Sequence, residues 1–151
     1  MISLNNTMTT AKEYPGIWQR RRYAKDVDSS LVGRRVVLCG WVHRKRTHGG
    51  VLFIILRDAT GTIQLSAHRD RVPADVFASA ERVTLESSIT AEGTVVADER
   101  APRGIELALS DLKVVHMAEP WPVQKTTRKV FLLDHRHLHL RSLKVRSVML
   151  V

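Results

Sequence analysis

The sequence predicts an all-β fold: a five-stranded Greek-key barrel with one helix between its third and fourth strands, followed by a C-terminal linker or hinge segment. Three observations support this prediction. Short β-branched and apolar runs recur along residues 34–115, they follow the order three strands, one helix, two strands, and two of them contain a glycine in mid-run. A chain of 151 residues is long enough to bury one core of this kind.

Three strands come first. Residues 34–42 are β-branched and apolar, with Gly40 where a curled strand needs a bend or a bulge. Residues 43–50 are polar and basic, end in two glycines and are expected to form a loop. The apolar run at 51–56 is too short for a buried helix, which favours a strand. Residues 62–67 alternate, which predicts an inward face of Ile63, Leu65 and Ala67 and an outward face of Thr62, Gln64 and Ser66.

A helix and two strands follow. Residues 73–82 show helical spacing of apolar residues after Pro73, which is a good first helical residue. Residues 88–97 predict the fourth strand, and residues 105–115 predict a fifth, interrupted strand. This order is that of the OB-fold, whose face around its second and third strands binds oligonucleotides or oligosaccharides.

The chain divides into three predicted segments. Residues 1–19 are expected to be a flexible leader, residues 20–118 the barrel domain, and residues 119–151 a linker and hinge. Two prolines flank Trp121, which suits an extended linker, and residues 128–146 are dense in Arg, Lys, His and Leu.

The charge favours a polyanionic partner. Lys and Arg number 24 against 15 Asp and Glu, a formal net charge of +9, and each phosphate that such a surface neutralises releases counterions. An equally open explanation is a piece of a larger protein whose remainder is acidic. No apolar run approaches the length of a membrane span, the N-terminus lacks a secretory pattern, and Cys39 is the single cysteine. We therefore expect a cytoplasmic protein without a membrane partner.

The basic segment carries the candidate nucleic-acid site. His43, Arg44, Lys45 and Arg46 precede a strand that bears Phe53. Basic side chains that follow phosphates, beside an aromatic ring on which a base stacks, are what single-stranded nucleic acid requires, and each stacked base contributes about 1–3 kcal/mol. For Phe53 alone the aliphatic neighbours favour a place in the core.

Gln64 is the candidate reader of a base edge. It is expected on the outward face of the neighbouring strand, and its amide carries both a donor and an acceptor. Without the neighbouring Phe53, an outward glutamine on a strand is usually plain surface.

No catalytic or metal site is expected in this chain. His135, His137 and His139 alternate as they would on one face of a strand, a pattern that can bind zinc or nickel, but the intervening arginines would repel a cation. The sequence contains no Walker-type glycine-rich loop and no recognisable Ser/His/Asp arrangement. We therefore expect no cofactor here.

Two motifs resemble the N-terminal domain of aspartyl- and asparaginyl-tRNA synthetases. The first is Gly-Trp-Val-x-Arg-x-Arg from Gly40, and the second is Phe-x-x-x-Arg-Asp from Phe53. Residues 104–107 and 133–141 are more similar to the asparaginyl branch. The resemblance extends over about residues 22 to 147.

The resemblance implies an anticodon-binding function. In this family the OB-fold domain binds the anticodon stem-loop of tRNA Asn or tRNA Asp. The residue that matches Phe53 stacks on the central uridine, and the residue that matches Gln64 hydrogen-bonds the same base. Arg46 matches an arginine beside the loop, with Arg44 a weaker candidate, and we add the adjoining His43 and Lys45 to the expected RNA-binding set. A homodimer is a further expected assembly, since synthetase N-terminal domains help to form dimers.

The resemblance also implies that catalysis lies elsewhere. The family continues into a class II catalytic domain that uses ATP and Mg²⁺, whereas this sequence stops at Val151 before any of its motifs. We therefore expect no enzyme activity from the chain as it stands. An excised or truncated synthetase domain is favoured over a free-standing paralogue, because linker and hinge sequence continues to the last residues. Asparagine and aspartate specificity remain alternatives, as does an OB-fold that acts in RNA binding or protein assembly.

Overall fold

The computed structural model describes residues 21–123 and 127–149, so the predicted leader 1–19 lies outside the described residues. The chain divides into two compact units between Glu119 and Pro120. Within the described ranges, no helix is long and apolar enough to cross a membrane.

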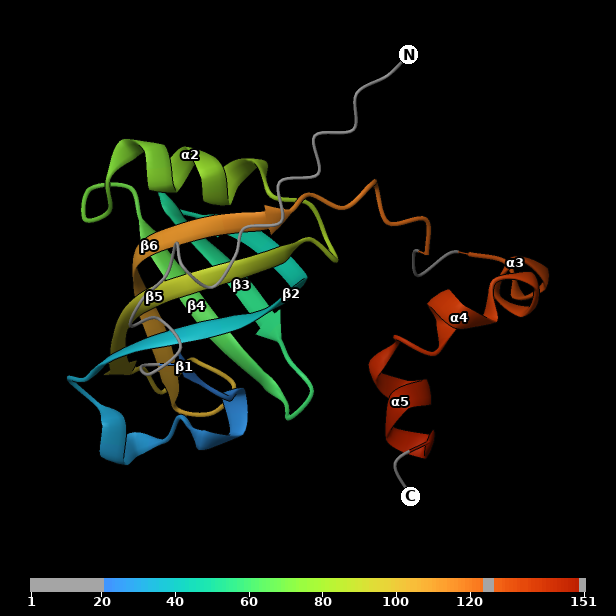
Figure 1. Ribbon diagram of the computed structural model, residues 1–151, viewed down its shortest axis with the longest axis horizontal. Coiled ribbons are helices and arrows are strands. Elements are labelled where there is room, and N and C mark those ends of the chain that lie inside the picture. The colour runs from blue at the N-terminus through green and yellow to red at the C-terminus, as the bar shows by residue number, and fades with distance from the viewer. Residues whose placement is uncertain (1–20, 124–126, 150–151) are drawn as a thin grey trace, which may run out of the picture. The chain divides into compact units, whose positions relative to one another are not determined.

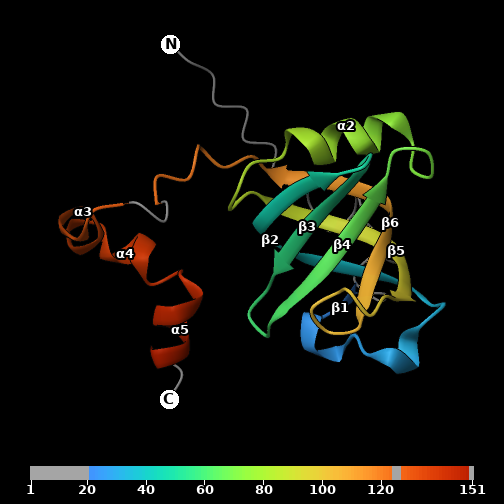
Figure 2. The same cartoon turned by 180° about the vertical axis from the view of Figure 1, so that it is seen from behind.

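The first unit is a closed β-barrel, which confirms the predicted OB-fold (Figures 1 and 2). The strand order is β1-β2-β3-β4-β6-β5, and a β2–β5 pairing closes a ring of five strands to which the short β1 is added. The helix α2 lies between the third and fourth strands of the ring, as predicted. The elements are β1 Arg21–Arg22, the 3₁₀ turns η2 Ala24–Asp26 and η3 Ser29–Leu31, β2 Arg35–His48, β3 Val51–Arg57, β4 Thr62–His68, α2 Ala74–Arg82, β5 Ser88–Ala97 and β6 Ile105–His116.

The strand β2 is longer than the sequence indicates. The prediction of a loop over residues 43–50 is wrong, because β2 continues to His48 and pairs with β3 as far as Val51. The connection is only Gly49 and Gly50, whose φ angles are +55° and +78°. A tight hairpin turn requires glycines with positive φ at both central positions. The two glycines therefore form the turn between β2 and β3, and the residues before them belong to the strand.

A one-residue bulge interrupts β2 at His43. Val42 pairs with Leu56, but Arg44 pairs with Ile55, so His43 is the extra residue on its strand. Val42 and Leu56 are both in the core. A single inserted residue reverses which side chains of the following strand segment face inward.

The bulge decides the direction of the basic side chains. Beyond it, Arg44 and Arg46 lie opposite Ile55 and Phe53 on the outer face of the barrel. The side chain of Lys45 is directed instead toward α2, where its Nζ meets the end of the helix. Regular alternation from Val42 would have turned both arginines toward the core.

Each end of the barrel is covered. At one end α2 buries its apolar residues, as its helical spacing predicted (Figure 1). At the other, a segment with the buried Ala24 and Val27 is held by two side chains from distant loops. Asp58 Oδ2 accepts a hydrogen bond from the amide of Ala24 at 2.7 Å, and Arg103 Nη2 donates to the carbonyl of Val27 at 2.9 Å.

The second unit is helical. It contains α3 Lys129–Asp134, α4 Arg136–His139 and α5 Leu143–Met149, and its role as a linker and hinge stays a prediction. The expectation that His135, His137 and His139 share one face of a strand is wrong, because this segment is helical and His135 stacks on Phe131. Across the described residues, no group of three or more His, Cys, Asp or Glu side chains could hold a metal ion.

Two mid-strand glycines mark close backbone approaches. A Cβ atom at Gly93 would lie 2.2 Å from the carbonyl oxygen of Ala108, and one at Gly40 would lie 2.5 Å from that of Arg57. Gly93 is also where the register of β5 against β6 shifts. The barrel therefore curls tightly at both positions because no side chain stands between the strands.

We expect Gly93→Ala to lower the free energy of unfolding by about 1–3 kcal/mol, because the added methyl group must displace backbone rather than a flexible side chain. Urea unfolding at equilibrium measures this change. Gly61→Ala is the matched control, since nothing lies within 4 Å of a Cβ atom there. Equal stability of the two variants would contradict the close-approach explanation.

Candidate nucleic-acid interface

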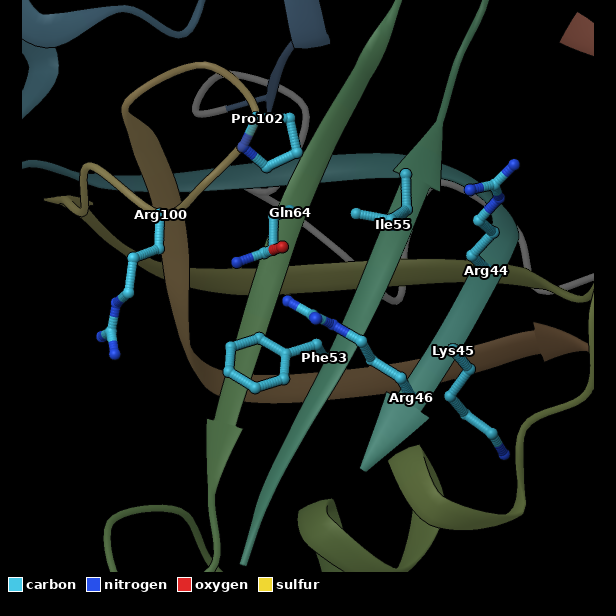
Figure 3. Close-up of a pocket in the computed structure, with 8 residues that line it drawn as sticks. All are labelled: Arg44, Lys45, Arg46, Phe53, Ile55, Gln64, Arg100 and Pro102. Carbon is cyan, nitrogen blue, oxygen red and sulfur yellow. The ribbon is translucent and has the colours of Figure 1, made fainter. Parts of the chain in front are cut away.

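A pocket of about 350 Å³ lies on the outer face of β2, β3 and β4, beside the β5–β6 loop (Figure 3). Five of the six residues predicted to bind RNA line it, and the sixth, His43, does not. The lining residues are Arg44, Lys45, Arg46, Phe53, Ile55, Gln64, Arg100 and Pro102.

Two cross-strand rows build the floor of the pocket. In one, Arg46 on β2 lies across from Phe53 on β3, which lies across from Ser66 on β4. In the other, Arg44 lies across from Ile55, which lies across from Gln64. Directly opposed residues on one face of a sheet are in side-chain contact, so the hairpin register alone brings the basic, aromatic and amide groups together.

Phe53 lies on the outer face of the barrel and not in the core. It is half-buried, and it is absent from the core cluster that contains its neighbours Leu52 and Ile54. The expectation from its aliphatic neighbours alone is therefore wrong, because those neighbours alternate with it across the sheet. The guanidinium carbon of Arg46 lies 4.7 Å from the centroid of the Phe53 ring. Figure 3 shows Arg46 extending from β2 across the pocket toward Phe53 and Gln64.

Gln64 faces outward from the barrel core and lines the pocket, but it is buried, with 5% of its surface exposed. The reason is that β6 pairs with β4 in parallel and places Glu106 directly across from Gln64. The amide nitrogen of Gln64 donates a hydrogen bond to Glu106 Oε2 at 2.8 Å, and Ser66 Oγ donates to Glu106 Oε1 at 2.7 Å.

The carboxylate of Glu106 fixes the orientation of the Gln64 amide. An ionised carboxylate only accepts hydrogen bonds, so the amide must turn its NH₂ group toward Glu106. The amide oxygen is then the group that is left for the pocket, and no described residue donates a hydrogen bond to it. The site therefore presents a hydrogen-bond acceptor next to an aromatic ring.

Two residues of this site, Glu106 and Arg100, are not predicted from the sequence. Glu106 is the single carboxylate in the otherwise apolar run 105–109. A lone acid in a buried strand needs a polar partner, and this feature of the sequence could have indicated Glu106 as a site residue. Arg100, on the β5–β6 loop, is exposed and forms a two-pronged ion pair with Asp98, with N–O distances of 3.1 Å. The irregular loop that carries Arg100 has no period from which its position could be predicted.

His43 points into a buried cluster instead of the pocket. Its Nδ1 lies 3.1 Å from Arg57 Nη1, and Arg57 Nη2 donates to both carboxylate oxygens of Glu86, at 2.7 and 2.8 Å. Burial first, and then the charge of Arg57, lowers the pKa of His43 below its usual value. A neutral ring accepts from Arg57 at Nδ1, so its Nε2 carries the proton, and that atom is buried without a partner among the described residues.

Lys45 fastens α2 to the sheet. Its Nζ donates to the carbonyl oxygens of Glu81 at 2.6 Å and Val83 at 2.7 Å, where α2 ends. A positive charge at this position also meets the negative end of the helix dipole. Burial lowers the pKa of Lys45. Although Lys45 lines the pocket, its ammonium group is directed to the helix.

Comparison with known proteins matches residues 36–115 to the tRNA anti-codon family, described as an OB-fold nucleic acid binding domain. The asparagine–tRNA ligase of Thermococcus gammatolerans is 43% identical over 129 residues, which is 85% of this chain and 30% of that protein. That of Pyrococcus abyssi is 40% identical over 134 residues, which is 87% of this chain and 31% of that protein. The chain thus spans less than a third of the length of these relatives.

A solved structure contains the same fold. The crystal structure of asparaginyl-tRNA synthetase from Pyrococcus horikoshii complexed with asparaginyl-adenylate aligns with a TM-score of 0.77 at 35% sequence identity. The alignment covers 85% of this chain and 30% of the Pyrococcus chain.

We expect the stability of the domain to fall as the pH drops below the ordinary histidine pKa of about 6.5. The folded chain keeps His43 neutral while the unfolded chain binds a proton there, so stability is fully present above that pKa and is lost toward the lower pKa of the folded state. Urea unfolding at about pH 7.5 and about pH 5 measures the loss. His43→Gln, which cannot titrate, should lose less stability over this interval, and an identical loss would contradict the assignment.

Proposed function

This chain belongs to the tRNA anti-codon family of OB-fold nucleic acid binding domains, and from that premise we propose that it binds the anticodon loop of a transfer RNA. The observation that carries the proposal is the pocket itself. It sets the half-buried ring of Phe53, the oriented amide of Gln64 and the outward guanidinium groups of Arg44 and Arg46 on one face of the sheet. This combination supplies a stacking platform, a reader of a base edge and partners for phosphates.

The oriented amide favours uracil as the stacked base. The amide oxygen of Gln64 is an acceptor, and uracil presents an N–H donor at N3, where cytosine presents an acceptor. A cytosine in the same position would place its N3 acceptor next to the Gln64 amide oxygen, which is also an acceptor. No hydrogen bond could then form between them, and the unsatisfied groups in a buried site would weaken binding. The proposed ligand is therefore an anticodon with U at its centre, as in tRNA Asn and tRNA Asp.

The two outward arginines are proposed to hold the phosphates on either side of that base. Arg46 covers the Phe53 ring in the free domain, so a base that stacks on Phe53 either replaces the guanidinium or lies beneath it. In both arrangements the positive charge stays beside the RNA backbone. Lys45 and His43 contribute in this proposal by holding the segment in place, because their polar atoms already bind α2 and Arg57.

The relatives support tRNA Asn as the natural partner. The proteins similar to this chain at about 40% identity are named asparagine–tRNA ligases, and we propose that this domain serves an asparaginyl-tRNA synthetase-like protein in the cytoplasm. An aspartyl-tRNA synthetase domain is the alternative, because the proposed pocket selects the central base and both tRNAs carry U there. In this proposal amino-acid activation with ATP and Mg²⁺ belongs to sequence outside this chain, which itself binds RNA without catalysis.

We expect the domain to bind a tRNA Asn anticodon stem-loop more tightly than the same stem-loop with C at the central position. Phe53→Ala should reduce the affinity for the U-containing RNA about 5- to 150-fold, as expected for the loss of one stacked base. Fluorescence anisotropy with labelled RNA, at two salt concentrations, measures both effects. Phe53→Tyr, which keeps the ring, is the control and should retain most of the affinity. Equal, weak and salt-sensitive binding of every RNA would mean a generic basic surface and would refute the proposal.

We expect Glu106→Gln to reduce the preference for U over C by about tenfold, since a neutral amide no longer forces the Gln64 oxygen toward the pocket. The ratio of the two affinities is the readout, because the removed negative charge should strengthen binding of both RNAs. Glu99→Gln removes the same charge from an exposed position of the β5–β6 loop and should leave the ratio unchanged. An unaltered ratio in Glu106→Gln would show that Glu106 does not set the hydrogen-bonding polarity of the site.

A further inference from the structure

A second pocket, of about 450 Å³, lies on the barrel where β2 pairs with β5. It is lined by Cys39 and Gly40 of β2 and by Ser88, Ile89 and Thr90 of β5. Its rim carries Arg21, Tyr23, Trp41 and Val115, which together we call the Trp41 face.

The Trp41 face exposes two aromatic rings to solvent. Trp41 is 43% exposed and Tyr23 is 44% exposed, although each adjoins a tightly packed core. The guanidinium carbon of Arg21 lies 5.0 Å from the centroid of the Tyr23 ring. Exposed aromatic rings beside arginine provide the stacking and charge that single-stranded nucleic acid uses, and they repeat the pairing of Arg46 with Phe53 in the first pocket.

The two pockets lie along the same strand. Trp41 precedes the bulge at His43, where β2 pairs with β5, and Arg44 follows it, where β2 pairs with β3. At about 3.3 Å per residue, Trp41 and Arg44 are about 10 Å apart along the strand. Figures 1 and 2 show β2 passing from one side of the barrel to the other. A nucleic-acid strand with one base in the Phe53 pocket therefore reaches the Trp41 face within a few nucleotides.

The charge of the Trp41 face suits a polyanion. Arg21 lies on its rim, with its guanidinium beside the Tyr23 ring. Asp58 is the carboxylate among the lining residues, and its oxygens accept hydrogen bonds from Ala24, Thr60 and Gly61. Because that carboxylate is occupied by backbone donors and turned into the structure, the rim presents positive charge and aromatic rings outward.

We propose that the Trp41 face is a second RNA-binding site, which stacks bases of the strand that leaves the Phe53 pocket past Arg44. This inference rests on the proposed function, because it takes the first base to lie on Phe53. The bound class is single-stranded or looped RNA that extends beyond the anticodon bases.

The test compares two RNAs, a short single strand limited to the anticodon bases and the whole anticodon stem-loop with its flanking nucleotides. Trp41→Ala should weaken binding of the longer RNA about 5- to 100-fold and leave the affinity for the short RNA within about twofold. Trp41→Phe should restore most of the affinity for the longer RNA. Val32→Ala, at another exposed apolar position, is the control for a general surface effect and should change neither affinity.

Two other results would contradict a second RNA-binding site at the Trp41 face. Unchanged binding of the longer RNA by Trp41→Ala, or an equal loss for both RNAs, would overturn the inference. A loss of self-association in Trp41→Ala, measured by sedimentation of the free chain, together with unchanged RNA affinity, would assign the face to a protein partner instead. The proposed function fails differently, through the absence of a preference for U and of an effect of Phe53→Ala on the short RNA.

Discussion

The buried ion pair of Arg57 and Glu86 is the interaction on which the geometry of the interface depends. The side chain of Arg57 is 6% exposed, and it joins the end of β3 to the α2–β5 connection and to the bulge at His43. Glu86 holds its place with a φ of +65°, a backbone conformation that side chains seldom adopt without tertiary support. The pair is tied to the bulge on both sides: Arg57 contacts the His43 ring, and the backbone of Val42 exchanges hydrogen bonds with Glu86 and Ser87. A shift of the bulge by one residue would break these contacts. The bulge is therefore fixed, and with it the outward direction of Arg44 and Arg46.

A second buried carboxylate, Glu106, has a comparable effect on the chemistry of the pocket. Glu86 determines where the basic side chains stand, whereas Glu106 determines which end of the Gln64 amide is offered to a ligand. Neither carboxylate needs to touch the ligand to exert its effect. Since both lie in the sheet or its connections, the positions and hydrogen-bonding polarity of the site are set before binding, which reduces the ordering that binding must pay for.

The sequence predicts the barrel well because strand order and alternation are local properties. It also groups Phe53, Gln64 and Arg46 correctly, through alternation and through motifs at fixed spacing. The extension of β2 to His48 was missed because the outer face of a barrel carries polar residues without a hydrophobic period. The direction of Lys45 toward α2 follows from the bulge, which contacts Arg57 fourteen residues beyond His43. The burial of Gln64 depends on a partner 42 residues away, and no local pattern contains that information.

The spacing of Phe-x-x-x-Arg-Asp has a geometric basis in β3. Phe53 and Arg57 lie four residues apart on the same outer face, while Leu52, Ile54 and Leu56 fill the core between them. One face of a single strand thus carries both the stacking ring and the guanidinium that locks the opposing bulge. Asp58 follows in the turn and holds the segment at Ala24, which adjoins Tyr23 of the Trp41 face. An insertion between Phe53 and Arg57 would turn one of the two side chains into the core. The spacing of the motif is therefore explained by the alternation of side chains along a strand, and not by a contact between Phe53 and Arg57.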